Sequence, residues 1–415
     1  MKILHLVHNY YPSPGGPQYS IKHLSEKLIE YYDDETEVAT SDSFYGPHHA
    51  MYKKISPRFE IINKVKIFRM PFRRWHFGLI KFTGKVFGKI TGKALPLSIR
   101  KLRYGFDSPA LIKFLNHSNA DVVMGTTCIN NFAEYPLWRF KTKKPKPFIL
   151  YGAIHIHEDG AIGEMELTKI NCCDCYIANT QYEMDQLIQA GVDADKIKAI
   201  GTAVDVNDFI VDEKNIFNFK KQYGIVEDDI VIGYTGSIKI GKGVGILVDA
   251  FMKLYAVNAK VKLLVCGSYT SYSDELGQLA KEKNLPIIII NNFNETEKVL
   301  CFHAMDIFVL PSASESFGVV FLEAWASKKP VIGSSIGAVK SLISDGTDGL
   351  IFEKKNSDSL FTALQKLTDD KNLRTALGNN GYKKAVEKYN WPLIVKLYRE
   401  AYLFAIHRFT KTYKA

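Results

Sequence analysis

Two glutamates, Glu315 and Glu323, stand eight residues apart where the sequence changes from a strand-like to a helix-like pattern. Residues 307–310 are strand formers, and an apolar helical pattern follows Gly318 and ends near Ser327. Glu315 is therefore expected in the loop after a strand. Glu323 is expected on the second turn of the next helix, where side chains lean back toward the helix start.

The start of this predicted helix, at Gly318 and Val319, suits an anionic ligand. Its first backbone N–H groups lack intrahelical partners and carry the positive end of the helix dipole, which favours a diphosphate. A carboxylate nearby can accept two hydrogen bonds from a ribose diol. Two glutamates at this spacing are common by chance, but a strand-to-helix turn is where open α/β sheets bind ligands. The pattern predicts a site for a nucleotide diphosphate that carries a further group.

Two glycine-containing turns support this prediction. Gly15 and Gly16 join the first predicted strand to the first helix, and glycine lets the backbone approach a phosphate or a sugar closely. No third glycine follows at the offset of a dinucleotide fingerprint. Lys242 follows the strand at 230–235 and precedes Gly243 at a predicted helix start. An ammonium group there suits a diphosphate oxygen. Considered alone, Gly15 and Gly16 would indicate only a tight turn, and Lys242 only a solvated lysine.

Together these segments resemble the retaining glycosyltransferases of family four, which have the GT-B fold. The stretch from Glu315 to Glu323 looks like the Glu-x7-Glu motif of that family. Residues 1–16 are similar to its opening strand and glycine loop, and residues 233–243 to the phosphate-binding start of its second domain. Residues 176–183 and then 201–209 resemble its domain junction. The segments match in order and spacing over nearly the whole chain.

The resemblance implies two Rossmann-like parallel-sheet domains that face a central cleft. Residues 1–205 would bind the acceptor, residues 206–390 would bind the nucleotide sugar, and a C-terminal helix at 391–415 would cross back to the first domain. The family retains the anomeric configuration, has no established protein nucleophile, and requires no metal at the phosphates. UDP is expected rather than GDP as the nucleotide of the donor, because UDP-sugars are the more frequent donors in the family.

The resemblance also assigns roles to individual residues. Glu315 would contact the donor sugar, His155 would lie near the reacting carbon, and Glu323 would hold the ribose. The expected donor-binding positions are Gly15, Gly16, Lys242, Gly243, Gly267, Phe293, Gly318, Val319 and Glu323. One departure concerns Ser237, which stands where the family usually has an arginine, so half of the usual cationic clamp on the diphosphate is missing.

Composition limits the class of protein. The chain has 415 residues, 46% of them hydrophobic, which allows two or three domains with substantial cores. No stretch reaches the roughly 18 apolar residues of a membrane span, and the first strand is too short for a signal peptide. A cytoplasmic location is therefore expected. Six cysteines are present, and the cluster at 172–175 has no partner ligands at zinc spacing, so buried thiols are expected there.

The positive charge is concentrated in one segment. Residues 63–106 contain twelve Lys and Arg and no Asp or Glu, whereas the net charge of the whole chain is +10. Large aromatic residues are interleaved with the basic ones, which suits an anionic membrane surface more than a solvated face. Nucleic acid is a competing partner, but no recognition motif is present. The membrane-docking residues predicted in this segment are Arg73, Arg74, Trp75, Lys81 and Lys85.

Strand patterns alternate with helical patterns from end to end, which predicts an α/β protein with parallel sheets covered on both faces. The acceptor expected from the basic aromatic segment is a lipid-linked saccharide in polysaccharide or glycolipid assembly. The oligomeric state stays open. Alternatives from other classes are a nucleotide-sugar epimerase on the same fold, a non-catalytic membrane-associated partner protein and a glycoside hydrolase, which would have no use for Lys242.

Overall fold

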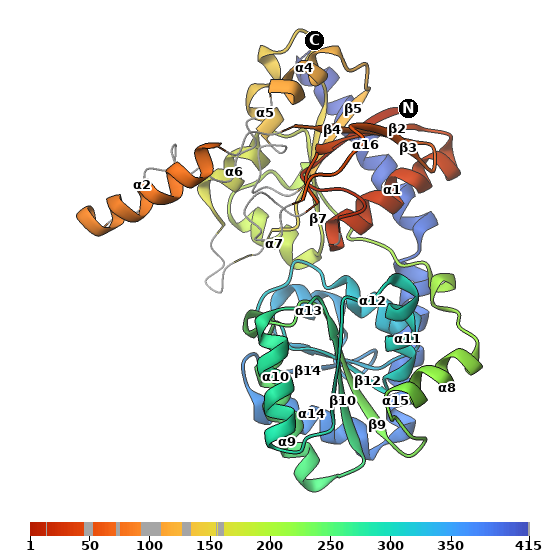
Figure 1. Ribbon diagram of the computed structural model, residues 1–415. Helices are drawn as coiled ribbons and strands as arrows, with labels where there is room; N and C mark the ends of the chain where they lie inside the picture. Colours follow the sequence, from red (N-terminus) through yellow and green to blue (C-terminus); the bar gives the residue numbers. More distant parts are fainter. Residues whose placement is uncertain are drawn as a thin grey trace. The chain divides into compact units, whose positions relative to one another are not determined.

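The computed structural model describes residues 1–13, 15–44, 53–71, 75–92, 109–126, 134–154, 156 and 162–413. The chain forms two compact units. The first consists of Met1–Asn179, Glu183–Gly201 and Ile394–Ala415, and the second of Thr180–Tyr182 and Thr202–Leu393. Each unit is built around its own sheet, and Figure 1 shows both.

The first unit contains, within the described residues, an eight-stranded sheet in the order β3-β4-β2-β1-β5-β6-β7-β8. Its strands are β1 (Lys2–Val7), β2 (Glu35–Ser41), β3 (Phe59–Ile62), β4 (Val65–Met70), β5 (Val122–Thr126), β6 (Phe148–Tyr151), β7 (Cys175–Ala178) and β8 (Ile197–Ala199). Its helices are α1 (Gly16–Tyr32), α2 (Trp75–Thr91), α4 (Pro109–His117), α5 (Tyr135–Trp138), α6 (Glu164–Asn171), α7 (Gln181–Gln189), which begins in the second unit, and most of α16 (Trp391–Tyr413). The central strands are almost wholly buried, as parallel strands covered on both faces must be.

One edge of this sheet is antiparallel, whereas a parallel sheet was predicted. The strand β3 is antiparallel to β4, whereas all other neighbouring strands in the sheet are parallel. Asn63 and Lys64 connect β3 to β4, and both have positive φ angles, of 48° and 68°. Positive φ at both central residues is the geometry of a type I′ hairpin turn. The sequence analysis missed β3 because Lys64 is an unusual residue for this turn.

The second unit has a six-stranded parallel sheet in the order β11-β10-β9-β12-β13-β14. Its strands are β9 (Ile230–Thr235), β10 (Val261–Gly267), β11 (Ile287–Asn291), β12 (Ile307–Leu310), β13 (Val331–Ser334) and β14 (Leu350–Phe352). Its helices are α8 (Glu213–Gln222), α9 (Val244–Val257), α10 (Ser271–Glu282), α11 (Glu295–Ala304), α12 (Val319–Ala326), α13 (Gly337–Leu342), α14 (Ser357–Asp369) and α15 (Lys371–Lys388).

The strand order of the second sheet reverses between β9 and β12. From β9 the chain passes outward to β10 and β11, and then returns to start the other half at β12. Right-handed crossovers place α9 and α10 on one face and α11 and α12 on the other, as Figure 1 shows. Such a reversal leaves a crevice at the carboxyl ends of the two central strands, which is the preferred ligand site of open α/β sheets.

The C-terminal helix α16 packs on the first unit from Ile394 onward. The hydroxyl of Tyr402 lies 2.9 Å from Nε2 of the buried His5 on β1, and Arg399 forms an ion pair of 3.0 Å with Asp34. Burial lowers the pKa of His5 to about 3, so its ring stays neutral and its hydrogen bonds do not change near neutral pH. The last residues of the chain are therefore part of the first sheet's packing.

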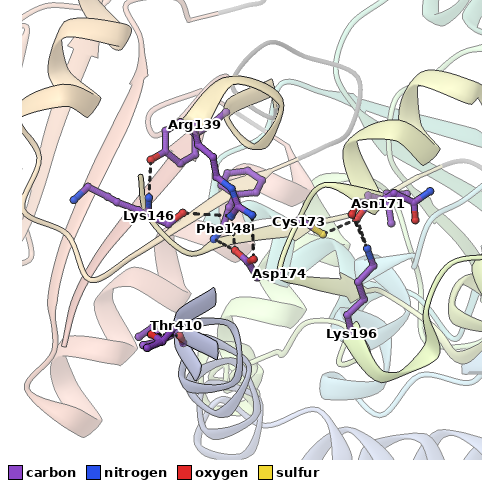
Figure 2. Close-up of polar contacts among 11 residues, drawn as sticks. Arg139, Lys146, Phe148, Asn171, Cys173, Asp174, Lys196 and Thr410 are labelled. Atoms are coloured by element: carbon purple, nitrogen blue, oxygen red, sulfur yellow. Dashed lines mark hydrogen bonds and ion pairs between the residues drawn. The ribbon is translucent and has the colours of Figure 1, made fainter. Parts of the chain in front are cut away.

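The cysteine-rich segment at 172–175 is part of a buried polar cluster in the first unit (Figure 2). Asp174 forms a buried ion pair with Arg139 and accepts a hydrogen bond of 2.7 Å from the backbone N–H of Phe148. Lys196 donates to the carbonyls of Ile170 and Asn171 at 2.9 and 3.0 Å, at the end of α6. Burial raises the pKa of the Cys173 thiol to about 12. Cys173 and Cys175 are buried as expected, but Cys172 is exposed, so the expectation was wrong for that residue. No group of His, Cys, Asp and Glu able to hold a metal occurs among the residues that the structure describes.

A second buried acid, Glu183, lies at the ends of β6 and β7. Its carboxylate accepts hydrogen bonds from the hydroxyl of Tyr176 at 2.5 Å and from the backbone N–H of Asn179 at 2.8 Å. A Cβ at Gly152 would collide with Tyr176 and Glu183, so glycine is required for this close packing. Burial raises the pKa of Glu183 to about 7, although its hydrogen bonds oppose that shift.

Candidate functional site

The candidate site lies in the second unit, at the carboxyl ends of β9 and β12. Lys242 ends a short 3-10 turn (Ile240–Lys242) that follows β9, and Glu315 lies in the loop between β12 and α12. The Lys242 ammonium nitrogen is 2.6 Å from Oε1 of Glu315. The two side chains keep 28% and 13% of their surface exposed, so the ion pair is partly open to a ligand. The structure brings together two residues that the sequence analysis predicted separately.

Gly243 explains why the two loops approach each other. Its φ angle is 76°, in the left-handed region, and it is the residue immediately before α9. A Cβ at this position would collide with the backbone carbonyl oxygen of Pro311, which directly follows β12. Because β9 and β12 are neighbours in the sheet, glycine allows the turn after one strand to lie against the end of the other. The Lys242 side chain is placed by this contact.

Gly318 has a similar left-handed backbone conformation immediately before α12. It has a φ angle of 90° and is the N-cap of the helix, whose first residue is Val319. The cap makes no side-chain hydrogen bond, so the first N–H groups of α12 retain their capacity for an anion. These groups lie at the same reversal of strand order as Lys242 and Glu315. The predicted diphosphate position at Gly318 and Val319 is thus compatible with the local geometry.

Glu323 lies on the buried side of α12, with only 8% of its side chain exposed. Its Oε1 is 2.9 Å from the ammonium nitrogen of Lys298 on α11. Lys298 also forms an ion pair of 2.6 Å with the exposed Glu295. Burial opposes the charged form of Lys298, but the charges of Glu323 and Glu295 outweigh burial and raise the pKa of Lys298.

Sequence reasoning missed Lys298, although a signal was present. Lys298 precedes the buried residues Cys301 and Phe302 by three and four positions, so it lies on the core-facing side of α11. A lysine on the apolar side of a helix requires a buried anion. The helix α12 lies on the same face of the sheet and supplies this anion as Glu323.

The positions predicted around the nucleotide base lie at the ends of β10 and β11. A Cβ at Gly267 would collide with the carbonyl oxygen of Gly236, so the end of β10 contacts the turn after β9. Phe293 is partly buried and packs against the core of the second unit. Ser237, which replaces the usual arginine of the family, accepts a hydrogen bond of 2.8 Å from the Tyr234 hydroxyl through its backbone carbonyl. Burial and the charge of Glu315 both raise the pKa of Tyr234, which therefore remains a neutral donor.

The first unit carries the other predicted positions. Gly15 has a φ angle of 143° and is the N-cap of α1, and Gly16 is the first residue of that helix. They follow β1, where the strand order of the first sheet also reverses between β1 and β5. His155 lies outside the described residues.

The predicted membrane-docking residues are only partly covered by the described structure. Arg73 and Arg74 lie outside the described residues, Trp75 and Lys81 belong to α2, and Lys85 is exposed on α2. The structure adds a feature that the sequence analysis did not single out, which is a set of exposed apolar side chains on α2 at helical spacing: Leu79, Phe82, Val86 and Ile90. Within the described ranges, no helix has the length and apolar character needed to cross a bilayer.

Comparison with solved structures identifies the class of fold. Anabaena HepE, solved in complex with UDP and glucose, matches with a TM-score of 0.71 over 96% of this chain and 98% of that chain, at 18% identity. The catalytic domain of starch synthase IV from Arabidopsis thaliana, bound to ADP and acarbose, matches with a TM-score of 0.72 over 98% of this chain and 99% of that chain, at 12% identity. The predicted α/β architecture with the GT-B fold is confirmed.

The family follows from the sequence comparisons. Residues 215–384 match the model of the family Glycosyl transferases group 1, so the chain carries the domain of this family and the resemblance noted above is confirmed. An uncharacterized glycosyltransferase of Methanocaldococcus jannaschii is 28% identical over 59% of this chain and 64% of its own length. The capsular polysaccharide biosynthesis glycosyltransferase CapM of Staphylococcus aureus is 30% identical over 42% of this chain and 46% of its own length. The chain thus spans about half the length of the curated relatives it matches.

Proposed function

We propose that the protein is a retaining glycosyltransferase that moves a sugar from a nucleotide diphosphate to an acceptor hydroxyl. The observation that supports this most is the Lys242–Glu315 ion pair at the reversal of strand order in the second sheet. It places one cation and one carboxylate beside the start of α12, which is the combination that a diphosphate with an attached sugar requires. A glycoside hydrolase would have no use for the cation.

In the proposed reaction, the bond between the anomeric carbon and the diphosphate oxygen breaks, and its electron pair leaves with the diphosphate. A new bond forms from the acceptor oxygen to the same face of the sugar, and the hydroxyl proton passes to the released diphosphate. Lys242 and the N–H groups at Gly318 and Val319 stabilise the negative charge that develops on the leaving group. Glu315 contacts the donor sugar, Glu323 accepts from the ribose, and Gly267 and Phe293 border the base.

The donor is proposed to be a UDP-sugar bound by residues 206–390, without a metal ion. Anabaena HepE is solved with UDP and glucose, which makes UDP-glucose the first donor to test. Residues 1–205 are proposed to bind the acceptor, with His155 near the reacting carbon. Gly15 and Gly16 at the β1–α1 turn are proposed to contact the donor. Residues 391–415 complete this domain.

The acceptor is proposed to be a lipid-linked saccharide at an anionic membrane surface. Two observations support this. The helix α2 exposes apolar side chains within the most basic segment of the chain, and relatives include CapM and a lipopolysaccharide 1,2-N-acetylglucosaminetransferase of Salmonella typhimurium. An amphipathic basic helix suits the headgroup region of anionic bilayers.

A donor screen tests the function directly. The purified protein is incubated with UDP-, GDP- and ADP-sugars, with and without EDTA and with lipid-linked saccharides, and released nucleotide is measured. We expect UDP release that depends on the acceptor and is unaffected by EDTA. Conversion of the sugar without nucleotide release would identify an epimerase, and absence of any turnover or donor binding would favour a non-catalytic partner protein.

A further inference from the structure

The ion pair between Lys298 and Glu323 has no role in the function proposed so far. Lys298 lies on α11 and Glu323 on α12, and their charged atoms are 2.9 Å apart. Lys298 keeps 13% and Glu323 only 8% of its side chain exposed, so both charges are largely removed from water. The outer partner of Lys298 is Glu295, whose side chain is 80% exposed.

The orientation of a buried carboxylate depends on the groups that contact it. Lys298 is the cation within 4 Å of Glu323 in the described part of the chain. Because both side chains are largely buried, this ion pair limits the directions in which the Glu323 oxygens can point.

We propose that Lys298 is a positioning residue that holds the Glu323 carboxylate in a fixed orientation, so that it recognises the 2′,3′-diol of the donor nucleoside. Lys298 binds Oε1 from the α11 side, which fixes the plane of the carboxylate and leaves its other acceptor positions for the ribose. This inference rests on the proposed function, because it assigns to Glu323 a ribose of a nucleoside diphosphate.

The location of Lys298 supports this role over a purely structural one. Gly318, the N-cap of α12, follows Glu315 of the Lys242–Glu315 ion pair by three residues, and Glu323 lies on the second turn of the same helix. A cation fixed at Glu323 therefore acts within the proposed donor site. Lys298 and Lys242 have separate carboxylate partners, Glu323 and Glu315, so a change at Lys298 leaves the Lys242–Glu315 ion pair in place.

The test compares the binding of UDP and 2′-deoxy-UDP by calorimetry, with GDP and ADP and their deoxy forms if UDP does not bind. A hydrogen bond to a charged group is worth about 1.5–3 kcal/mol, which corresponds to a preference for the ribo form of roughly 10- to 150-fold. We expect the native protein to bind UDP more tightly than 2′-deoxy-UDP by this factor. In Lys298→Met the ratio of the two affinities should fall toward one, and in Lys298→Arg it should recover. If Lys298→Met does not fold, Lys298→Gln gives the same comparison because its amide carries no charge.

The matched control is Lys262→Met. Lys262 forms an ion pair of 3.1 Å with Asp229, and the two side chains are 23% and 11% exposed, in the same unit but away from the site. This variant should keep the native preference. An unchanged preference in Lys298→Met overturns the inference while the proposed function stands. Failure of the native protein to bind any of these nucleotides overturns the proposed function, and the inference with it.

Discussion

Lys242 and Glu315 are 73 residues apart in the sequence, yet their charged atoms lie 2.6 Å apart. They meet at the carboxyl ends of the two central strands of the second sheet. The reversal of strand order between β9 and β12 brings the two loops together, and Gly243 permits the close approach. The ion pair therefore results from the topology of the sheet. It gives the site a cation and a carboxylate in one place before any ligand is bound.

Removal of either charge should disable the transfer reaction. We expect Glu315→Ala and Lys242→Met each to lower turnover by roughly 100-fold or more, because each removes a charged group from the reacting centre. The double variant should lose less than the product of the two effects, since contacting residues couple. Steady-state nucleotide release measures turnover, and circular dichroism checks the fold.

Lys253→Met is the control for this experiment, because Lys253 forms an exposed ion pair with Asp358 at 2.5 Å. Its turnover should equal that of the native protein. Native turnover in Glu315→Ala would remove that residue from the site.

Two neighbouring glycines provide a second comparison. Gly243→Ala should lower stability by about 2 kcal/mol or more, since it combines a left-handed backbone with a collision at Pro311. Gly241→Ala should be tolerated, because a Cβ at Gly241 meets nothing within 4 Å. Urea unfolding and donor binding are measured for both variants. Equal stability of the two would show that the turn before α9 does not need glycine.

The apolar side of α2 is expected to bind anionic bilayers. Replacing Phe82 and Ile90 with serine should reduce co-sedimentation with vesicles that contain phosphatidylglycerol, because both side chains are exposed and bury apolar area in the headgroup region. Neutral replacements of Arg73, Arg74 and Lys81 should weaken the same binding, and more strongly at low salt.

Phe217→Ser is the control for the membrane experiment, because Phe217 is an exposed aromatic residue of the second unit. It should leave sedimentation unchanged. If all variants bind vesicles as the native protein does, α2 is not the docking surface.

Glu183 should make the stability of the first unit depend on pH. Its folded pKa is about 7, above the ordinary value of 4.5. Between these values the unfolded chain loses the proton while the folded state keeps it, so stability falls as pH rises toward 7 and the loss is complete above it. The loss is on the order of 3 kcal/mol.

The glutamine variant isolates this effect. Glu183→Gln stays neutral at every pH, so its midpoint of thermal unfolding should fall less than that of the native protein between pH 5 and pH 8. His5 and other groups contribute equally to both proteins. Parallel pH curves for the two proteins would contradict the assignment.

Local sequence patterns predicted much of the second unit. The strands expected at 230–235 and 307–310 have those bounds in the structure, because each is a short run of β-branched and apolar residues between clear turn signals. The places of Lys242, Gly243 and Gly318 at the ends of these strands followed from the same patterns. Their roles in binding a donor stay predictions.

Contacts between distant segments were not predictable in the same way. The pairing of Lys242 with Glu315 depends on which strands are neighbours, and sequence spacing does not give this order. Lys298 was missed because Glu295 and Lys298, three residues apart, resemble an ordinary solvated pair. Only the ion pair between α11 and α12 in the structure shows that Glu323 is the buried partner.

The division of the first unit into separate stretches of chain affects how the protein is made. The second unit is nearly continuous, from Thr202 to Leu393, but the first needs Ile394–Ala415 as well as the start of the chain. During synthesis the unit that begins first is therefore completed only after the whole of the second unit has been made. A chain truncated before residue 394 would contain all of the second unit, but its first unit would lack the contact of Tyr402 with His5.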